Sequence, residues 1–201
     1  MRIHFHKDSA EAEFLLKRDP TLKPLFDKTD HVSFEVGGDH FMMLVDAIIG
    51  QQLSSKAAAS ILIRVKEHFE NNVTPEKILA AKEDELRDLG LSWQKVSYLC
   101  SLAELTKNGE IDFKRIESLS DREITEMLIR VKGIGKWTVE MFLLFSLGRR
   151  DVFSSGDLGI RNALKKLYQR EFTPKEAERL AERWKPYRSM VTHFLWHYLE
   201  N

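Results

Sequence analysis

The sequence predicts an all-α protein. Proline and glycine are sparse, with 5 and 10 among 201 residues. Apolar residues recur at spacings of three and four along most of the chain, which is the period of a helix that buries one face. Hydrophobic residues make up 43% and charged residues 31%, a balance that excludes a disordered or fibrous chain. We therefore expect one domain of packed helices over residues 1–201, without internal repeats or long linkers.

Apolar spacing and capping residues define the helices in order. Ser54, Thr74 and Thr173 each precede a helical pattern and can accept a hydrogen bond from its first turn. Proline follows each of the two threonines, at the position where its fixed φ suits a helix. The expected helices are Ala10–Lys17, His40–Ile49, Ser54–Phe69, Pro75–Ala80, Glu83–Leu89, Ser92–Lys107, Asp121–Val131, Lys136–Leu147, Leu158–Tyr168, Pro174–Trp184 and Arg188–Leu199.

Extended structure is expected in one place. Only His31–Val36 alternates like a strand, which predicts a short extended piece or an edge ribbon. The amino terminus, with His4 and His6, shows no such pattern, and we expect irregular chain there.

Several protein classes are excluded by what the chain contains. Its longest apolar stretches, such as Met141 to Gly148, are far shorter than the roughly 20 residues that cross a bilayer. The polar amino terminus has no apolar core of a secretion signal, so we expect an intracellular protein, cytoplasmic in a bacterium or archaeon and nuclear in a eukaryote. A single cysteine, Cys100, excludes a disulfide framework, a four-cysteine zinc site and an iron–sulfur cluster bound by the chain's own thiolates.

The charge is balanced in total and uneven along the chain. Residues 128–201 hold 14 Lys and Arg against 8 Asp and Glu, whereas residues 1–127 hold 17 against 23. A basic carboxyl-terminal third can face a polyanion, although compositional scatter would give the same count.

The most informative segment is Leu128–Thr138, with the sequence LIRVKGIGKWT. Two glycines flank Ile134 in a tight turn between two predicted helices, which is a helix-hairpin-helix pattern. Gly133 and Gly135 let the backbone approach a phosphate closely, and the N–H groups that open the second helix point at the anion. Lys132 and Lys136 add positive charge, so the hairpin should hold DNA backbone without reading sequence. The alternative is an ordinary helix–helix turn.

A second segment, DVFSSGDLGIR at 151–161, places Asp157 directly before a predicted helix. A lone aspartate there is usually an N-cap. Together with the hairpin, however, this segment resembles the helix-hairpin-helix DNA glycosylases, and within them the 3-methyladenine DNA glycosylase II type. That family joins a V-x-G-I-G-x-W-T hairpin to a downstream D-L-G, as in 131–138 and 157–159 here. The resemblance implies that Asp157 is the catalytic carboxylate.

Two further segments match the same family. Ile49–Ser54, with the sequence IGQQLS, resembles the turn that enters the minor groove, so Gln52 and Leu53 are the candidates to fill the space of the extruded nucleotide, with Ser54 also at the DNA. The alternative is a polar loop that caps the next helix, and both can hold. The segment WKPYRS at 184–189, followed by Trp196, resembles a family segment in which Arg188 and Ser189 order a helix start. Lys95 falls in a third similar stretch, with a structural role.

The resemblance also implies a base pocket and a fold. The pocket candidates are Trp137, Trp196, Tyr187 and Met141, the last standing where close relatives often carry an aromatic residue. The fold would have two lobes with the active site in the cleft between them. One lobe would take about 1–36 plus 150–201 and the other about 37–149, with the hairpin at 128–138.

The expected activity is that of a monofunctional DNA glycosylase of base excision repair. It would flip an alkylated purine such as 3-methyladenine or 7-methylguanine out of double-stranded DNA and hydrolyse its N-glycosidic bond. Family members with lyase activity carry a lysine two residues after the second hairpin glycine, where this chain has Trp137; Lys136, one residue earlier, points about 100° away.

No cofactor is expected. His193 and His197 share a helix face but lack a third ligand, so we expect no metal bound by side chains. The family's hairpin commonly binds Na⁺ or K⁺ through backbone carbonyls, here near Val131 and Ile134. We expect a monomer that needs no membrane. The competing interpretations are a non-catalytic helix-hairpin-helix DNA-binding module and a helical protein-interaction domain.

Overall fold

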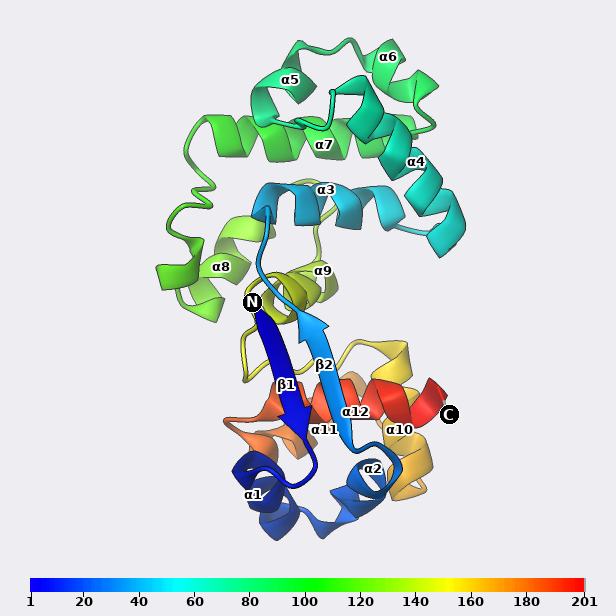
Figure 1. The fold of residues 1–201 in the computed structure, drawn as a ribbon, viewed down its shortest axis with the longest axis vertical. Coiled ribbons are helices and arrows are strands. Elements are labelled where there is room, and N and C mark those ends of the chain that lie inside the picture. Colours follow the sequence, from blue (N-terminus) through cyan, green and yellow to red (C-terminus); the bar gives the residue numbers. More distant parts are fainter. Residues whose placement is uncertain (201) are drawn as a thin grey trace. The chain divides into compact units, whose positions relative to one another are not determined.

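The computed structural model describes residues 1–200, and it is mostly helical, as predicted (Figure 1). Twelve α-helices and one two-stranded sheet are found in this part of the chain. Their bounds are β1 Arg2–His6, α1 Ala10–Arg18, α2 Lys23–Lys28, β2 His31–Glu35, α3 His40–Gly50, α4 Ser55–His68, α5 Pro75–Ala80, α6 Glu83–Asp88, α7 Trp93–Lys107, α8 Asp121–Leu128, α9 Lys136–Met141, α10 Leu158–Tyr168, α11 Pro174–Ala181 and α12 Arg188–Glu200.

The amino terminus is ordered, and the expectation of irregular chain there is wrong. Strand β1 pairs antiparallel with β2, with Ile3 opposite Phe34 and Phe5 opposite Val32. Ile3 and Phe5 are buried while their neighbours are exposed, which is the period-two pattern of a strand. The sequence contains this alternation over five residues only, and the pairing with β2 that makes it a strand joins segments far apart in the chain.

Other elements also differ from the sequence-based expectations, among them α11, which ends at Ala181 instead of Trp184 and continues as a 3-10 turn over Glu182–Trp184. Helix α2 was missed; it begins with Pro24 in its first turn and buries Leu25 and Phe26. Helix α8 ends at Leu128 instead of Val131, because the chain already turns there toward the hairpin. Helix α9 ends at Met141 and is followed by a π-helical turn, Phe142–Ser146.

The predicted caps are confirmed. Ser54 Oγ accepts a hydrogen bond from the Ala57 N–H at 3.3 Å, and Thr74 Oγ1 accepts one from the Lys77 N–H at 3.3 Å. Thr173 forms a capping box with Glu176 at the start of α11. These contacts satisfy N–H groups that the first turn of a helix leaves without partners.

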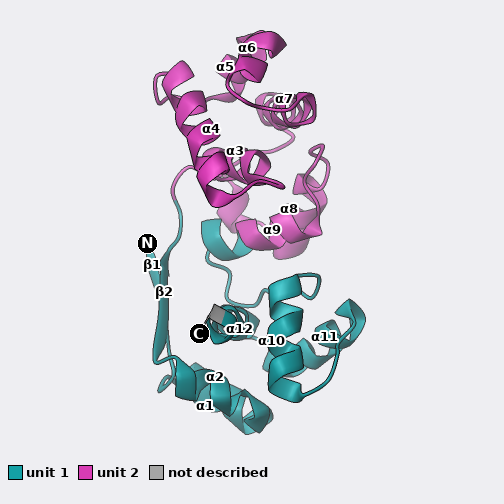
Figure 2. Cartoon of the chain, turned by 90° about the vertical axis from the view of Figure 1, so that its right-hand side faces the viewer, with its two compact units in different colours: residues 1–37, 143–201 teal, residues 38–142 magenta. Residues whose placement is uncertain are grey.

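The chain forms two compact units (Figure 2). Unit 1 comprises Met1–Gly37 and Leu143–Asn201, and unit 2 comprises Gly38–Phe142. The lobes expected from the sequence place the second boundary at about 149/150, later than the boundary between these units.

Unit 1 is organised around a buried carboxylate as well as an apolar core. Its core includes Leu15, Trp184 and Phe194, all fully buried. Asp19 is 2% exposed and accepts hydrogen bonds from the Tyr168 hydroxyl and from Trp184 Nε1, the latter at 3.0 Å. A buried charge needs such donors, so Asp19 ties the end of α1 to α10 and to the segment before α12.

Unit 2 is a purely helical body. Helix α7 packs against α3, α5 and α6, and its buried residues, Leu99 and Leu102 among them, form the centre of this unit. In the described residues of both units, no helix has the length and apolar character needed to cross a membrane.

Candidate functional site

The hairpin between α8 and α9 depends on one glycine for its shape. Gly133 has φ +79°, a conformation that L side chains rarely adopt, and a Cβ added to it would lie 2.1 Å from the Tyr98 ring. Gly135 is the N-cap of α9, with φ −103°, and a Cβ on it would meet nothing within 4 Å. Gly133 is therefore required by the fold, whereas Gly135 leaves open space at the start of the helix.

The hairpin side chains divide into two groups. Lys132 and Lys136 are exposed, although Lys136 Nζ lies 3.5 Å from Glu140 Oε1. Ile134 and Thr138, by contrast, are only 5% and 7% exposed. The two buried residues hold the hairpin onto unit 2, so a DNA contact by either of them has to be made by its backbone.

The turn after α3, residues Gln51–Ser54, is presented toward solvent. Gln52 has a left-handed backbone with φ 56°, and the side chain of Leu53 is 39% exposed although it is apolar. Ser54 caps α4, as described above. A left-handed backbone at a residue other than glycine is uncommon and is found more often at functional sites, so this turn is a candidate site.

The turn is fastened to the hairpin by a side chain. Gln51 Nε2 donates a hydrogen bond of 2.8 Å to the Gly133 carbonyl. From the other side, Lys95 Nζ donates one of 2.7 Å to the Ile49 carbonyl, and partial burial lowers the pKa of the Lys95 amine. The structural role expected for Lys95 is thus that of a support at the end of α3.

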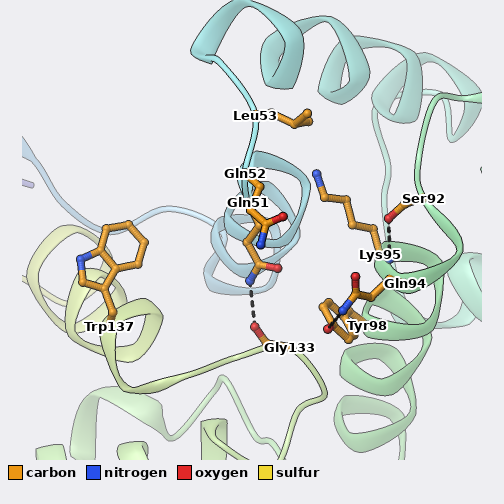
Figure 3. A pocket seen from close by; sticks show the side chains of 9 residues that line it. All are labelled: Gln51, Gln52, Leu53, Ser92, Gln94, Lys95, Tyr98, Gly133 and Trp137. Atoms are coloured by element: carbon orange, nitrogen blue, oxygen red, sulfur yellow. Dashed lines mark hydrogen bonds between the residues drawn. The ribbon is translucent and has the colours of Figure 1, made fainter. Parts of the chain in front are cut away.

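These elements surround a hollow of about 650 Å³ within unit 2 (Figure 3). Trp137, 51% exposed, lies at one side of it, and the first turns of α7 lie at the other. Sequence reasoning missed three of its lining residues: Ser92, Gln94 and Tyr98. Gln94 and Tyr98 are one helical turn apart and hydrogen-bonded to each other; the sequence shows this spacing, but it carries no signal that joins Tyr98 to the hairpin 35 positions later.

In unit 1, Asp157 is the N-cap of α10. Its Oδ1 accepts a hydrogen bond of 2.9 Å from the Ile160 N–H and one of 3.2 Å from Trp196 Nε1. The capping interpretation of Asp157 is therefore confirmed. Its catalytic role stays a prediction, and the same geometry holds the carboxylate in a fixed orientation.

The loop before Asp157 is anchored by the start of α12. Ser189 Oγ donates to the Arg149 carbonyl at 2.6 Å and accepts from the Val152 N–H at 2.9 Å. Arg188 Nε donates to Asp151 Oδ1 at 2.8 Å. Arg188 and Ser189 thus fix both the helix start and the loop that leads to Asp157.

The remaining pocket candidates lie in different surroundings. Tyr187 packs its ring edge-on against Phe14 of α1, with centroids 5.3 Å apart. Met141 is half-buried at the end of α9. The structure thus brings Trp196 to Asp157 and Trp137 to the exposed turn, while Tyr187 contacts the first helix; a role for any of the four in a base pocket stays a prediction.

His193 is part of the core of unit 1. It is 4% exposed and stacks on Phe34 with centroids 4.0 Å apart. Burial lowers its pKa to about 3, so the imidazole is neutral near pH 7. In residues 1–200 no group of three His, Cys, Asp or Glu side chains is arranged to hold a metal ion.

A helix-hairpin-helix turn, an exposed turn and a fixed carboxylate are the features expected of a helical protein that binds DNA. The family model for HhH-GPD superfamily base excision DNA repair proteins matches residues 45–187. DNA-3-methyladenine glycosylase 1 of Schizosaccharomyces pombe is 40% identical over 158 residues, which cover 76% of this chain and 69% of the relative.

Two solved structures share the fold. A DNA-3-methyladenine glycosidase from Bacillus halodurans matches with a TM-score of 0.89 and 33% identity, over 97% of this chain and 91% of the other. The S. pombe 3-methyladenine DNA glycosylase Mag1, in complex with abasic DNA, matches with a TM-score of 0.79 and 32% identity, over 94% and 95%. The chain belongs to the HhH-GPD superfamily of base excision DNA repair proteins. Within it, the chain is of the 3-methyladenine DNA glycosylase type.

Proposed function

We propose that this protein is a monofunctional DNA-3-methyladenine glycosylase, which releases alkylated purines such as 3-methyladenine and 7-methylguanine from double-stranded DNA. The observation that carries the proposal is the fixed carboxylate of Asp157, with Oδ1 between the Ile160 N–H and the Trp196 indole. The activity of the relatives and the abasic DNA bound by Mag1 support it.

Asp157 acts on the sugar. N-alkylation leaves the purine cationic, so the base departs readily and positive charge develops on the sugar as the C–N bond breaks. An ionised carboxylate beside the sugar stabilises that charge and orients or deprotonates the attacking water. The aromatic rings of the pocket candidates favour a cationic base over a neutral one, by about 0.5–2 kcal/mol per stacked contact.

The strand stays intact after base loss. The lyase reaction needs an amine that attacks the sugar, and Trp137 occupies the position of that amine in the hairpin. The neighbouring Lys136 lies by Glu140 instead.

Unit 2 holds the DNA. The hairpin backbone and Lys132 bind phosphates, and the turn at Gln52 and Leu53 fills the space of the extruded nucleotide. Of the two, Leu53 is the better plug, because its exposed apolar side chain gains by entering the base stack. A Na⁺ or K⁺ ion at the carbonyls near Val131 and Ile134 would stiffen the hairpin. The protein needs no other cofactor and acts as a monomer.

The test compares the wild type with Asp157→Asn on alkylated duplex DNA. Asparagine is as good an N-cap as aspartate, so the variant keeps the helix start and loses only the charge. We expect base release to fall at least about a hundredfold with DNA affinity retained, and strand breaks to appear only after alkali. DNA binding without base release by the wild type would favour the non-catalytic binding module, and breaks without alkali would contradict the monofunctional assignment.

A further inference from the structure

The carboxylate of Asp157 and the indole of Trp196 meet although 39 residues separate them in the chain. Trp196 Nε1 donates its hydrogen to Oδ1 at 3.2 Å, and the Ile160 N–H donates to the same oxygen at 2.9 Å. The backbone donor belongs to α10, as in any capped helix. The indole donor belongs to α12, so it fixes the carboxylate from a second direction.

The ring of Trp196 is held in place by other rings. Phe145 stacks on it with an interplanar angle of 17° and centroids 5.8 Å apart. His193 meets it edge-on at 83° and 5.4 Å, and His193 in turn stacks on Phe34 of β2. The indole therefore cannot rotate without disturbing a packed aromatic cluster, and its N–H has a defined direction.

Gly159 leaves room for this arrangement. A Cβ at position 159 would lie 3.1 Å from Asp157 Oδ1 and 3.5 Å from Trp196 Cδ1. The first contact is closer than a methyl group and a carboxylate oxygen tolerate without movement. The absence of a side chain at this position lets the carboxylate and the indole approach each other.

We propose that Trp196 is a positioning residue for Asp157, whose indole N–H aligns the carboxylate with the cationic sugar of the transition state. This proposal rests on the proposed function. It gives Trp196 a role besides stacking on the flipped base, because its N–H points at Asp157 and Phe145 packs against its ring.

The test uses Trp196→Phe, which keeps an aromatic ring and removes the N–H. We expect the single-turnover rate of base release to fall about tenfold to a hundredfold, the range for one hydrogen bond to a charged group. Affinity for DNA with a neutral tetrahydrofuran abasic site should stay within about twofold of the wild type. Affinity for DNA with a cationic pyrrolidine abasic site should fall with the rate, because only this probe needs the aligned carboxylate. Tyr198→Phe, on the same helix, is the matched control and should leave all three quantities unchanged.

A double-mutant cycle with Asp157→Asn separates the possible failures. In the Asp157→Asn background, Trp196→Phe should have no further effect on the preference for pyrrolidine over tetrahydrofuran. Full base release by Asp157→Asn would overturn the proposed function itself. Loss of release by Asp157→Asn with an unchanged pyrrolidine preference in Trp196→Phe would overturn only the positioning role. Thermal unfolding of each variant checks that the fold is intact. If Trp196→Phe does not fold, the preference for pyrrolidine over tetrahydrofuran DNA is measured with Gly159→Ala, which crowds the contact between Asp157 and Trp196.

Discussion

The two units hold their functional residues in different ways. In unit 1, Asp157 is fixed through side chains: the indole of Trp196 contacts it, and Arg188 and Ser189 anchor the loop before it. In unit 2, the hairpin and the exposed turn are fixed mainly through the backbone. Gly133 and Gln52 have left-handed conformations, and Gln51 and Lys95 bind main-chain carbonyls.

The proposed function gives this difference a reason, because it asks each region to present something different. A carboxylate that stabilises a developing charge has to be oriented within a fraction of an ångström, and this needs a packed set of side chains. A surface that holds DNA phosphates presents backbone N–H groups and lysines, so the path of the backbone decides the fit. Substitutions in unit 2 should therefore act through fold and affinity, and those near Asp157 through rate.

The largest effect is expected for Gly133→Ala. The added methyl group would overlap the Tyr98 ring, and the positive φ is unfavourable for alanine, so the free energy of unfolding should fall by about 2–4 kcal/mol. Denaturant unfolding measures this. Gly135→Ala is the control, because its Cβ meets nothing and its φ is ordinary; it should lose no more than about 1 kcal/mol, the cost of alanine in place of glycine at an N-cap, and weaken DNA binding. Equal stability of both variants would mean that the backbone of the hairpin is not the fixed element.

A second prediction concerns acid stability in unit 1. The pKa of His193 is about 3 in the folded protein against an ordinary value of 6.5, because burial among aromatic rings disfavours its charged form. The unfolded chain therefore binds a proton that the folded protein does not, and stability is lost as the pH falls below 6.5. Between pH 7 and pH 5 the loss should be about 2 kcal/mol.

The control is His193→Phe, which keeps a ring at this position and cannot titrate. Its free energy of unfolding should fall less than that of the wild type over the same pH range. His197 is the other titratable group that acts on His193, and the aromatic rings around His193 are those of Phe5, Phe34, Phe145 and Trp196. The same acid sensitivity in both proteins would show that the loss arises elsewhere.

Most of the helices could be predicted from the sequence, because their signals are local. The hairpin glycines, the cap at Asp157 and the exposed turn lie in short motifs whose chemistry is readable residue by residue. What could not be predicted joins distant segments. The ring of Tyr98 under Gly133 spans 35 positions, and the contact of Trp196 with Asp157 spans 39. Gly133 is an example. The sequence predicted that this turn needs the conformational freedom of glycine, but it did not predict that the ring of Tyr98 leaves no room for a side chain.

A third prediction tests the catalytic side of the comparison. Gly159→Ala should lower the rate of base release about tenfold, because the added Cβ would displace the Asp157 carboxylate or the Trp196 ring. The free energy of unfolding should change by less than about 1 kcal/mol, because the helix preference of alanine over glycine offsets the cost of the disturbed cap. Gly156→Ala, whose Cβ meets nothing within 4 Å, is the matched control for rate. A Gly159→Ala variant that is slow but stable would show that substitutions near Asp157 act on the rate and not on the fold. If stability fell as much as the rate did, substitutions in unit 1 and unit 2 would act in the same way.

The smallest effect is expected for Lys132→Ala in the hairpin. Removing one phosphate contact should weaken DNA binding a few-fold and reduce the slope of log affinity against log salt concentration by about one unit. Base release from a saturated complex should be unchanged, because the role proposed for Lys132 is to bind phosphate and not to act on the sugar.

Lys107→Ala is the control; Lys107 ends α7, roughly 20 Å along the helix from the turn that lines the hollow. If both variants lowered the salt dependence of DNA affinity equally, the net charge of the protein would account for the effect, and the hairpin would not be a specific phosphate-binding site. A lower slope for Lys132→Ala alone would assign the phosphate contact to the hairpin, and an unchanged rate would keep that contact apart from the chemistry at Asp157.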